Sequence, residues 1–119
     1  LVTRVAFRLA PGDPAVLRAT IERHVAERKR TQPVSARSAG CAFKNPPGDS
    51  AGRLVDAAGL KGLARGAAQV STLHGNFVVN RGGAAASDVL SLIAEVKRRV
   101  LESSGVALED EIVVWRRIG

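Results

Sequence analysis

The single cysteine of the chain, Cys41, is the residue whose chemistry most needs an interpretation. It lies in the stretch SAGCAFKNP (residues 38–46), between small side chains and shortly before two prolines. A thiol in a suitable setting can act as a nucleophile or a proton donor, whereas a lone cysteine is more often a small buried apolar residue. By residue type alone, Cys41 is therefore predicted to fill space in a core.

The two histidines offer Cys41 no clear partner. His24 and His74 share no metal-ligand spacing with the cysteine. Cys41 and His74 could form a nucleophile and its base, but the residues around them match no thiol-hydrolase signature. We expect His24 to lie on the face of a helix.

Two polar stretches resemble binding motifs only in part. The stretch GDSAGR (residues 48–53) lacks the Gly-Lys-Ser/Thr ending of a phosphate loop and does not follow a predicted strand. It is therefore predicted to be a helix N-terminus, which could still bind an anion through backbone N–H groups. The acidic cluster Glu109-Asp110-Glu111 is predicted to be a solvated turn.

The composition indicates a small domain with a packed core. A length of 119 residues suits one domain, or a domain plus part of another, and an apolar share of 45% argues against global disorder. One cysteine excludes an internal disulfide framework and favours a reducing, cytosolic setting. The chain contains no apolar run of about 18 residues, so no membrane-spanning helix is expected.

The formal net charge of +7 favours an anionic partner, such as nucleic acid, a phosphorylated metabolite or a carboxylate. Nucleic-acid surfaces commonly interleave basic and aromatic side chains. The basic run Arg28-Lys29-Arg30 has no aromatic neighbour, and the other charges are spread along the chain. A solvated basic surface is therefore predicted in preference to a nucleic-acid site.

Apolar periodicity and cap residues predict helices mixed with short strands. The predicted elements are a strand over 1–9, a helix from Pro14 to about Arg30 capped by Asp13, a loop over 31–50, a helix over 51–58, strands over 67–70 and 77–79, a helix over 87–103 with Ser87 as its N-cap, and a closing strand over 111–115. No regular β-α-β repeat appears, so the predicted class is α+β. Because the chain opens with leucine inside an alternating pattern, we expect a piece of a longer protein.

Three blocks of sequence carry a resemblance when their order and spacing are taken together. They are Phe-Lys-Asn-Pro (43–46), Gly-Leu-Lys-Gly (59–62) and His-x-Asn-Phe-x-x-Asn (74–80). With the helix and acidic block that follow, they resemble the C-terminal domain of the UDP-N-acetylenolpyruvoylglucosamine reductases, also called UDP-N-acetylmuramate dehydrogenases. The resemblance covers roughly residues 30–115, and the gapless run from Val70 to Asn80 is similar to the type II branch.

The resemblance implies an oxidoreductase of peptidoglycan synthesis. It reduces UDP-N-acetylglucosamine enolpyruvate to UDP-N-acetylmuramate, with NADPH as electron donor and FAD as carrier. In this family an N-terminal domain mainly holds the FAD. Residues 1–30 are thus expected to be the tail of the FAD-binding region and a connecting helix, and residues 31–119 the substrate-binding domain. This chain alone is expected to be inactive without the FAD domain.

The same resemblance assigns two catalytic residues. The family's proton donor is a serine at the position matched by Cys41, and some members carry cysteine there. A thiol, with an ordinary pKa of about 8.5, gives up its proton more readily than an alcohol does. Glu111 matches a glutamate that helps to stabilise or protonate the intermediate. Members often carry an arginine two residues later, where this chain has Val113; Arg116 is an alternative.

The matched blocks also imply substrate contacts. The implied substrate-binding residues are Asn45, Lys44, Gln69 and His74. The positive charge of the chain then suits the diphosphate and carboxylate of the substrate, and the basic residues that could meet the diphosphate are Arg28, Lys29, Arg37 and Lys44. The alternative is a stand-alone module that binds an anion or a nucleotide without catalysis.

Overall fold

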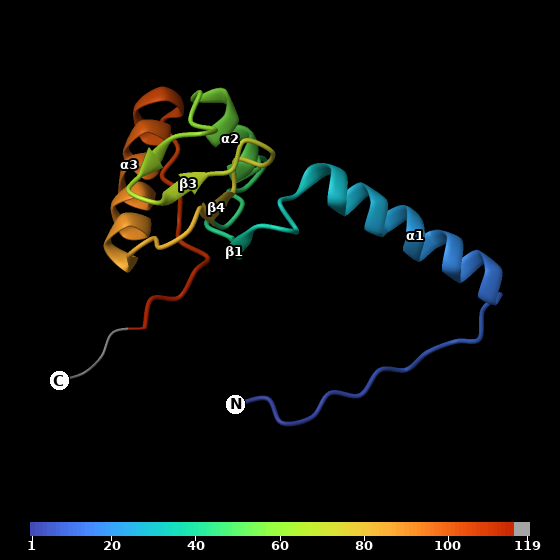
Figure 1. The fold of residues 1–119 in the computed structure, drawn as a ribbon. Helices are drawn as coiled ribbons and strands as arrows, with labels where there is room; N and C mark the ends of the chain where they lie inside the picture. The colour runs from blue at the N-terminus through green and yellow to red at the C-terminus, as the bar shows by residue number, and fades with distance from the viewer. Residues whose placement is uncertain (116–119) are drawn as a thin grey trace. The chain divides into compact units, whose positions relative to one another are not determined.

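The computed structural model describes residues 1–115, and the chain forms two units, Leu1–Arg30 and Thr31–Gly119. Figure 1 shows the elements in chain order: α1 (Pro14–Thr31), β1 (Arg37–Cys41), α2 (Ala51–Ala57), β2 (Ala64–Arg65), β3 (Ala68–Val70), β4 (Phe77–Asn80) and α3 (Ala86–Ser104). Within residues 1–115, three helices accompany a four-stranded antiparallel sheet, and the α+β prediction is confirmed. No helix among these residues is both long and apolar enough to cross a membrane.

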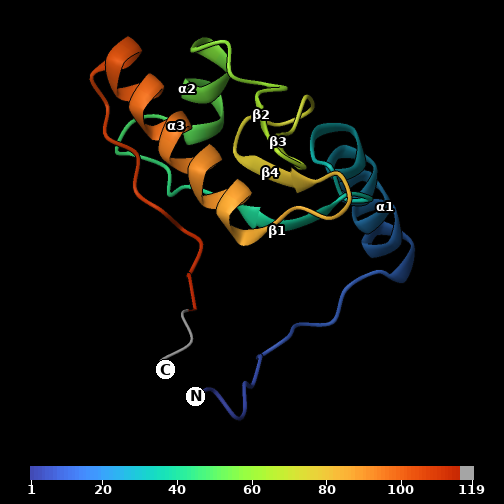
Figure 2. The same cartoon turned by 60° about the vertical axis from the view of Figure 1, so that its left-hand side comes forward.

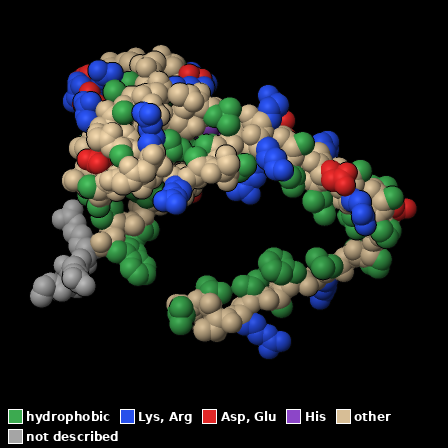
Figure 3. Space-filling view, viewed as in Figure 1, with side chains coloured by type: hydrophobic (Ala, Val, Ile, Leu, Met, Phe, Trp, Pro, Cys, Tyr) green, Lys and Arg blue, Asp and Glu red, His purple; other side chains and the backbone are tan. Residues whose placement is uncertain are grey.

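The first unit consists of an extended segment and α1. Asp13 caps the helix as predicted, because its Oδ1 accepts hydrogen bonds from the backbone N of Ala15 at 2.8 Å and of Val16 at 3.1 Å. α1 has no buried residue, and apolar side chains are exposed along the whole unit (Figure 3). The strand predicted over residues 1–9 is wrong, since a strand needs a neighbouring strand to pair its backbone groups and this segment has none.

The sheet of the second unit has the strand order β1-β4-β3-β2. β3 and β4 form a hairpin in which Val70 pairs with Val78, and β1 adds to the far side of β4, where Arg37 pairs with Asn80. The loop predicted over residues 31–50 therefore contains a strand. A second short strand, β2, was also not predicted; it pairs with β3 through Ala64 and Gln69.

α3 packs against β2 and β3, and Figure 2 shows it lying along the sheet. Helical spacing predicts an apolar face of Val89, Leu92, Ile93, Val96 and Val100. The last four of these are buried, and Val89 is partly buried against the core. The N-cap is Ala85, two residues before the predicted N-cap Ser87, and the Asp88 carboxylate accepts a hydrogen bond from the backbone N of Ala85 at 3.0 Å. Within the helix, Glu95 pairs with Arg99 at 2.9 Å.

α2 begins where the phosphate-loop-like stretch was predicted to start a helix. Ser50 is its N-cap, and Gly59 follows its end with a φ of +68°. Its side chains Leu54 and Val55 pack into the core with Phe43 and Leu60. The closing strand predicted over residues 111–115 is wrong, because the segment makes one isolated bridge, between Phe43 and Asp110, and residues 111–115 form no strand.

Candidate active site

Cys41 is the last residue of β1, at the point where the strand loses its regular register with β4. Ser38 pairs with Val79 and Cys41 with Phe77, so an irregularity lies between them. Gly40 provides it with a φ of +88°, a conformation that L side chains rarely adopt. Irregularities of this kind redirect the side chains that follow. Cys41 is half-buried here, so the prediction of a space-filling core cysteine is wrong.

A second segment runs beside the residues that follow Cys41. The backbone N of Glu111 donates to the carbonyl of Ala42 at 2.9 Å, and the backbone N of Lys44 donates to the carbonyl of Glu109 at 2.9 Å. These bonds flank the bridge between Phe43 and Asp110. They bring Glu111 alongside Cys41 although the two residues lie in opposite halves of the sequence.

The three carboxylates of this segment differ in their partners. Glu109 pairs with Lys44 at 3.2 Å, and Asp110 pairs with Lys97 at 3.0 Å. Glu111 has no ion-pair partner within residues 1–115. The acidic turn predicted from sequence is indeed exposed, and one of its carboxylates, which has no ion pair within residues 1–115, acts on the thiol.

Burial raises the pKa of the Cys41 thiol above its ordinary value, and the negative charge of Glu111 raises it further. Both effects favour the protonated thiol at neutral pH. A residue that keeps its proton suits a proton donor better than a nucleophile, which must be a thiolate. The electrostatics therefore favour proton donation among the roles considered for Cys41.

We expect the replacement Glu111→Gln to lower the pKa of Cys41, because it removes the negative charge that opposes thiolate formation. The measurement is the rate of alkylation by iodoacetamide against pH, and Cys41 is the only thiol that can react. The midpoint should lie above the ordinary thiol pKa of about 8.5 in the unchanged chain and should move down in the variant. Glu109→Gln is the matched control, since Glu109 already pairs with Lys44. An unchanged midpoint in Glu111→Gln would contradict the contact.

Of the implied substrate-binding residues, Asn45 and Lys44 line a hollow, whereas Gln69 and His74 make contacts within the domain. Asn45 Oδ1 accepts a hydrogen bond from the backbone N of Ala51 at 3.0 Å, which holds the start of α2, and its Nδ2 donates no hydrogen bond within the described chain. Asn45, Lys44 and Glu109 line a polar hollow of about 200 Å³ that also includes Pro46. Asn45 thus has one amide group in use and one available.

Gln69 and His74 both make contacts within the domain. Gln69 Nε2 donates to the carbonyl of Gly62 at 2.9 Å. His74 Nδ1 accepts from the backbone N of Asn76 at 3.1 Å, and its ring meets Phe77 edge-on. Burial, and then the positive charge of Lys61, lower the pKa of His74, which favours the neutral ring. The sequence alternative in which His74 serves as the base of Cys41 receives no support from these contacts.

An apolar hollow of about 320 Å³ lies beside the strand that ends in Cys41. It is lined by Ser38, Ala39 and Gly40 of β1 and by Val89, Ile93 and Ile112 on the opposite side. A side chain built on Gly40 would meet open space. The hollow lies beside residues 38–40 and Ala42 and can receive an apolar group; Cys41 does not line it.

Metal ligands, His24 and Arg116 add nothing to this site within the described residues. Residues 1–115 contain no cluster of three or more His, Cys, Asp or Glu side chains that could hold a metal ion. His24 lies exposed on α1. Arg116, the alternative to the arginine that Val113 replaces, lies outside the described residues.

Asn76 is a residue of this region to which the sequence assigned no role. It is 3% exposed, and its side chain hydrogen-bonds both backbone groups of Phe43. Asn76 belongs to the matched block of residues 74–80, but nothing in the sequence indicates its contact with Phe43.

Comparison with known proteins places these residues in a family. The family model described as UDP-N-acetylenolpyruvoylglucosamine reductase, C-terminal domain, matches residues 32–115. A protein of Myxococcus xanthus (strain DK1622) named UDP-N-acetylenolpyruvoylglucosamine reductase is 51% identical over 119 residues, which is 100% of this chain and 37% of that protein. The protein of the same name from Azorhizobium caulinodans is 50% identical over 119 residues and is covered to 38% of its length.

A solved structure agrees with the sequence comparisons. The crystal structure of UDP-N-acetylenolpyruvylglucosamine reductase from Thermus caldophilus is 54% identical, with a TM-score of 0.69. The similarity covers 86% of this chain and 35% of the Thermus chain. The chain thus spans little more than a third of the length of the relatives that it matches.

Proposed function

We propose, since this chain belongs to the UDP-N-acetylenolpyruvoylglucosamine reductase family, that it serves as the substrate-binding domain of such a reductase and that Cys41 protonates the substrate. The observation that carries the proposal is that Glu111, which has no ion-pair partner within residues 1–115, is held near the half-buried Cys41, where its charge and burial raise the pKa of the thiol. The reaction is the reduction of UDP-N-acetylglucosamine enolpyruvate to UDP-N-acetylmuramate, a step of peptidoglycan synthesis. We place it in the cytoplasm.

The hollow beside residues 38–40 suits part of the flavin that this reaction requires. Its walls are mainly apolar, and a side chain on Gly40 would meet open space, so a planar ring system can approach this stretch of β1. The residues of this chain that would border the ring are Ala39 and Gly40. The FAD, reduced by NADPH, supplies the hydride for the enolpyruvyl double bond; we propose that its main contacts belong to a further domain of the reductase.

Cys41 and Glu111 then complete the reduction. Addition of hydride to the methylene carbon leaves negative charge on the neighbouring carbon and its carboxylate. The Cys41 thiol donates its proton to that carbon from a fixed position at the end of β1. Glu111 keeps the thiol protonated until the negative intermediate forms, because its own charge disfavours the thiolate.

The substrate contacts follow from the free groups of the polar hollow. Asn45 Nδ2 can donate to an acceptor of the substrate, and Lys44 supplies positive charge at the same wall. Gln69 and His74 hold turns of the domain, and we propose that they act on the substrate indirectly. Residues 31–119 form the substrate-binding domain in this proposal, and residues 1–30 belong to the connection with the FAD-binding region.

The test is a chimeric reductase in which this chain replaces the 119 residues of the Myxococcus xanthus protein to which it aligns. We expect the chimera to oxidise NADPH when UDP-N-acetylglucosamine enolpyruvate is added, and we expect the 119-residue chain alone to be inactive. The measurements are the loss of NADPH absorbance and the appearance of UDP-N-acetylmuramate. The unmodified Myxococcus protein is the positive control.

One result would overturn the proposal. A chimera that folds and retains FAD, yet shows no NADPH oxidation in response to the substrate, would leave only a module that binds anions or nucleotides. Calorimetric titration of the 119-residue chain with UDP-N-acetylglucosamine and with inorganic diphosphate would then identify which of the two it binds.

A further inference from the structure

We propose that Asn76 is a positioning residue, which holds Cys41 and Glu111 together by fixing the backbone of residues 42 and 43. The inference rests on the proposed function only in taking these two side chains as the reacting pair. Asn76 lies at the entry to β4 and touches neither side chain through any hydrogen bond of the described chain. Its effect on the pair would therefore pass through the backbone.

The Asn76 carboxamide imitates a neighbouring strand. Its Oδ1 accepts from the backbone N of Phe43 at 2.9 Å, and its Nδ2 donates to the carbonyl of Phe43 at 2.8 Å. Its own carbonyl accepts from the backbone N of Ala42 at 2.8 Å. Three hydrogen bonds from one residue thus fix the three successive peptide units between Cys41 and Lys44.

The same short segment also positions Glu111. Ala42 is hydrogen-bonded to both residues: its N donates to the carbonyl of Asn76, and its carbonyl accepts from the backbone N of Glu111. Ala42 and Phe43 are both buried, at 2% and 1% exposure. A change in the path of these two residues would move both Cys41 and Glu111.

Asn76 is itself held firmly. Its backbone N donates to His74 Nδ1 at 3.1 Å, and Ser71 Oγ accepts from the backbone N of Leu73 and of His74. Gly75 allows close packing against α2, since a Cβ there would lie 2.6 Å from the carbonyl oxygen of Gly52. A rigid turn therefore presents the carboxamide to Phe43.

Glu111 is the charged group whose carboxylate raises the pKa of the Cys41 thiol. Its neighbours Glu109 and Asp110 are paired with Lys44 and Lys97. On the turn before β4, His74 Nδ1 accepts from the backbone N of Asn76. Because Glu111 has no ion pair within residues 1–115, its influence on the thiol reports how closely Cys41 and Glu111 are held.

The experiment is a double-mutant cycle read as the pKa of Cys41 in the 119-residue chain. The four proteins are the unchanged chain, Glu111→Gln, Asn76→Ala, and the double variant. In the unchanged chain, Glu111→Gln should lower the midpoint of alkylation. In the Asn76→Ala background we expect that lowering to shrink to less than half. A folded Asn76→Ala chain in which Glu111→Gln lowers the midpoint as much as before would overturn the inference.

Asn80→Ala is the matched control. Asn80 is the last residue of β4, and its Oδ1 accepts from the backbone N of Gly82 at 2.8 Å and of Ala84 at 3.1 Å. The substitution removes a carboxamide of the same kind and leaves the hydrogen bonds of residues 42 and 43 in place. The influence of Glu111 on the thiol should be unchanged in this background, and an equal loss there would attribute the effect to general loosening and overturn the inference.

Hydrogen exchange keeps the inference testable if Asn76→Ala does not fold. In the unchanged chain, the amides of Ala42, Phe43 and Glu111 should be protected together and open as one unit. Exchange of the Glu111 amide that is much faster than that of Phe43 would overturn the inference.

Neither measurement requires substrate or FAD. The chimera could be inactive while Asn76→Ala still weakens the effect of Glu111→Gln on the alkylation midpoint. That combination would count against the proposed function and leave the positioning role of Asn76 standing.

Discussion

Replacing Cys41 by alanine in the chimeric reductase is expected to slow the formation of UDP-N-acetylmuramate by roughly 10²- to 10⁴-fold, the usual contribution of a positioned proton donor. Consumption of NADPH in the absence of substrate should keep its normal rate, because that half of the reaction does not use the thiol. Rapid-mixing measurements of each half-reaction would separate the two effects.

Cys41→Ser is the control for this prediction. A hydroxyl occupies nearly the same space and matches the residue that most members of the family are expected to carry. The serine variant should therefore recover a large part of the activity that alanine loses, whereas loss through misfolding would not be repaired. Product formation at the normal rate in Cys41→Ala would refute the assignment of Cys41 as the donor.

The helices and the central hairpin could be predicted because their signals are local. α3 has an apolar face with helical spacing, α2 follows a serine cap, and the short apolar runs of β3 and β4 flank a turn. Each of these patterns is contained within one element. The structure shifted their ends by a residue or two, since cap hydrogen bonds, such as that from Ala85 to Asp88, decide where a helix starts.

β1 was missed because it has no strand-like composition. Its residues, Arg-Ser-Ala-Gly-Cys, show no alternation of apolar and polar side chains. The strand exists because β4 offers an open edge for hydrogen bonding, and the sequence of β1 does not record that edge. The reverse error occurred over residues 1–9 and 111–115, where the apolar pattern suits a strand but no partner strand lies beside it.

For the site, the sequence predicted which residues matter but not which of them lie close together. Family resemblance named Cys41 and Glu111, but their proximity depends on pairing between residues 42–44 and 109–111, which no local pattern predicts. The role of Asn76 was missed for the same reason, since its partner Phe43 lies on another strand. Asn45 was assigned to substrate, and the structure adds that it also holds the start of α2.

Phe43 links the stability of the domain to the geometry of the site, and Phe43→Ala should therefore have the largest effect on folding. The side chain is 1% exposed within the core formed by the sheet, α2 and α3. Truncating such a residue to alanine usually costs about 3–5 kcal/mol, because apolar contacts are lost and a cavity remains. The measurement is urea unfolding followed by circular dichroism, in which the midpoint should fall sharply.

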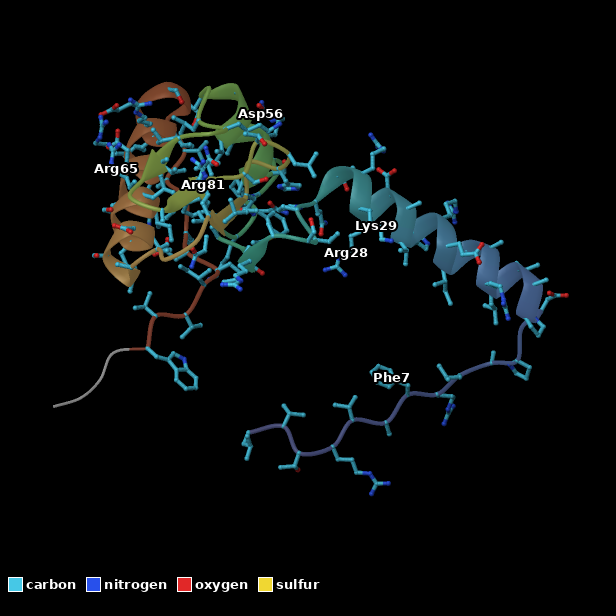
Figure 4. The ribbon with its side chains drawn as sticks, in the orientation of Figure 1. Phe7, Arg28, Lys29, Asp56, Arg65 and Arg81 are labelled. Atoms are coloured by element: carbon cyan, nitrogen blue, oxygen red, sulfur yellow. The ribbon has the colours of Figure 1, made fainter. Side chains whose placement is uncertain are left out.

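Phe7→Ala is the matched control, since the same side chain is 81% exposed in the first unit and extends from the chain (Figure 4). It should change the free energy of unfolding by no more than about 0.5 kcal/mol. Equal losses in the two variants would contradict the assignment of Phe43 to the core. In Phe43→Ala the backbone groups that Asn76 and Asp110 contact remain present, so a variant that still folds separates packing from positioning. The influence of Glu111 on the Cys41 thiol should then survive in Phe43→Ala despite its loss of stability.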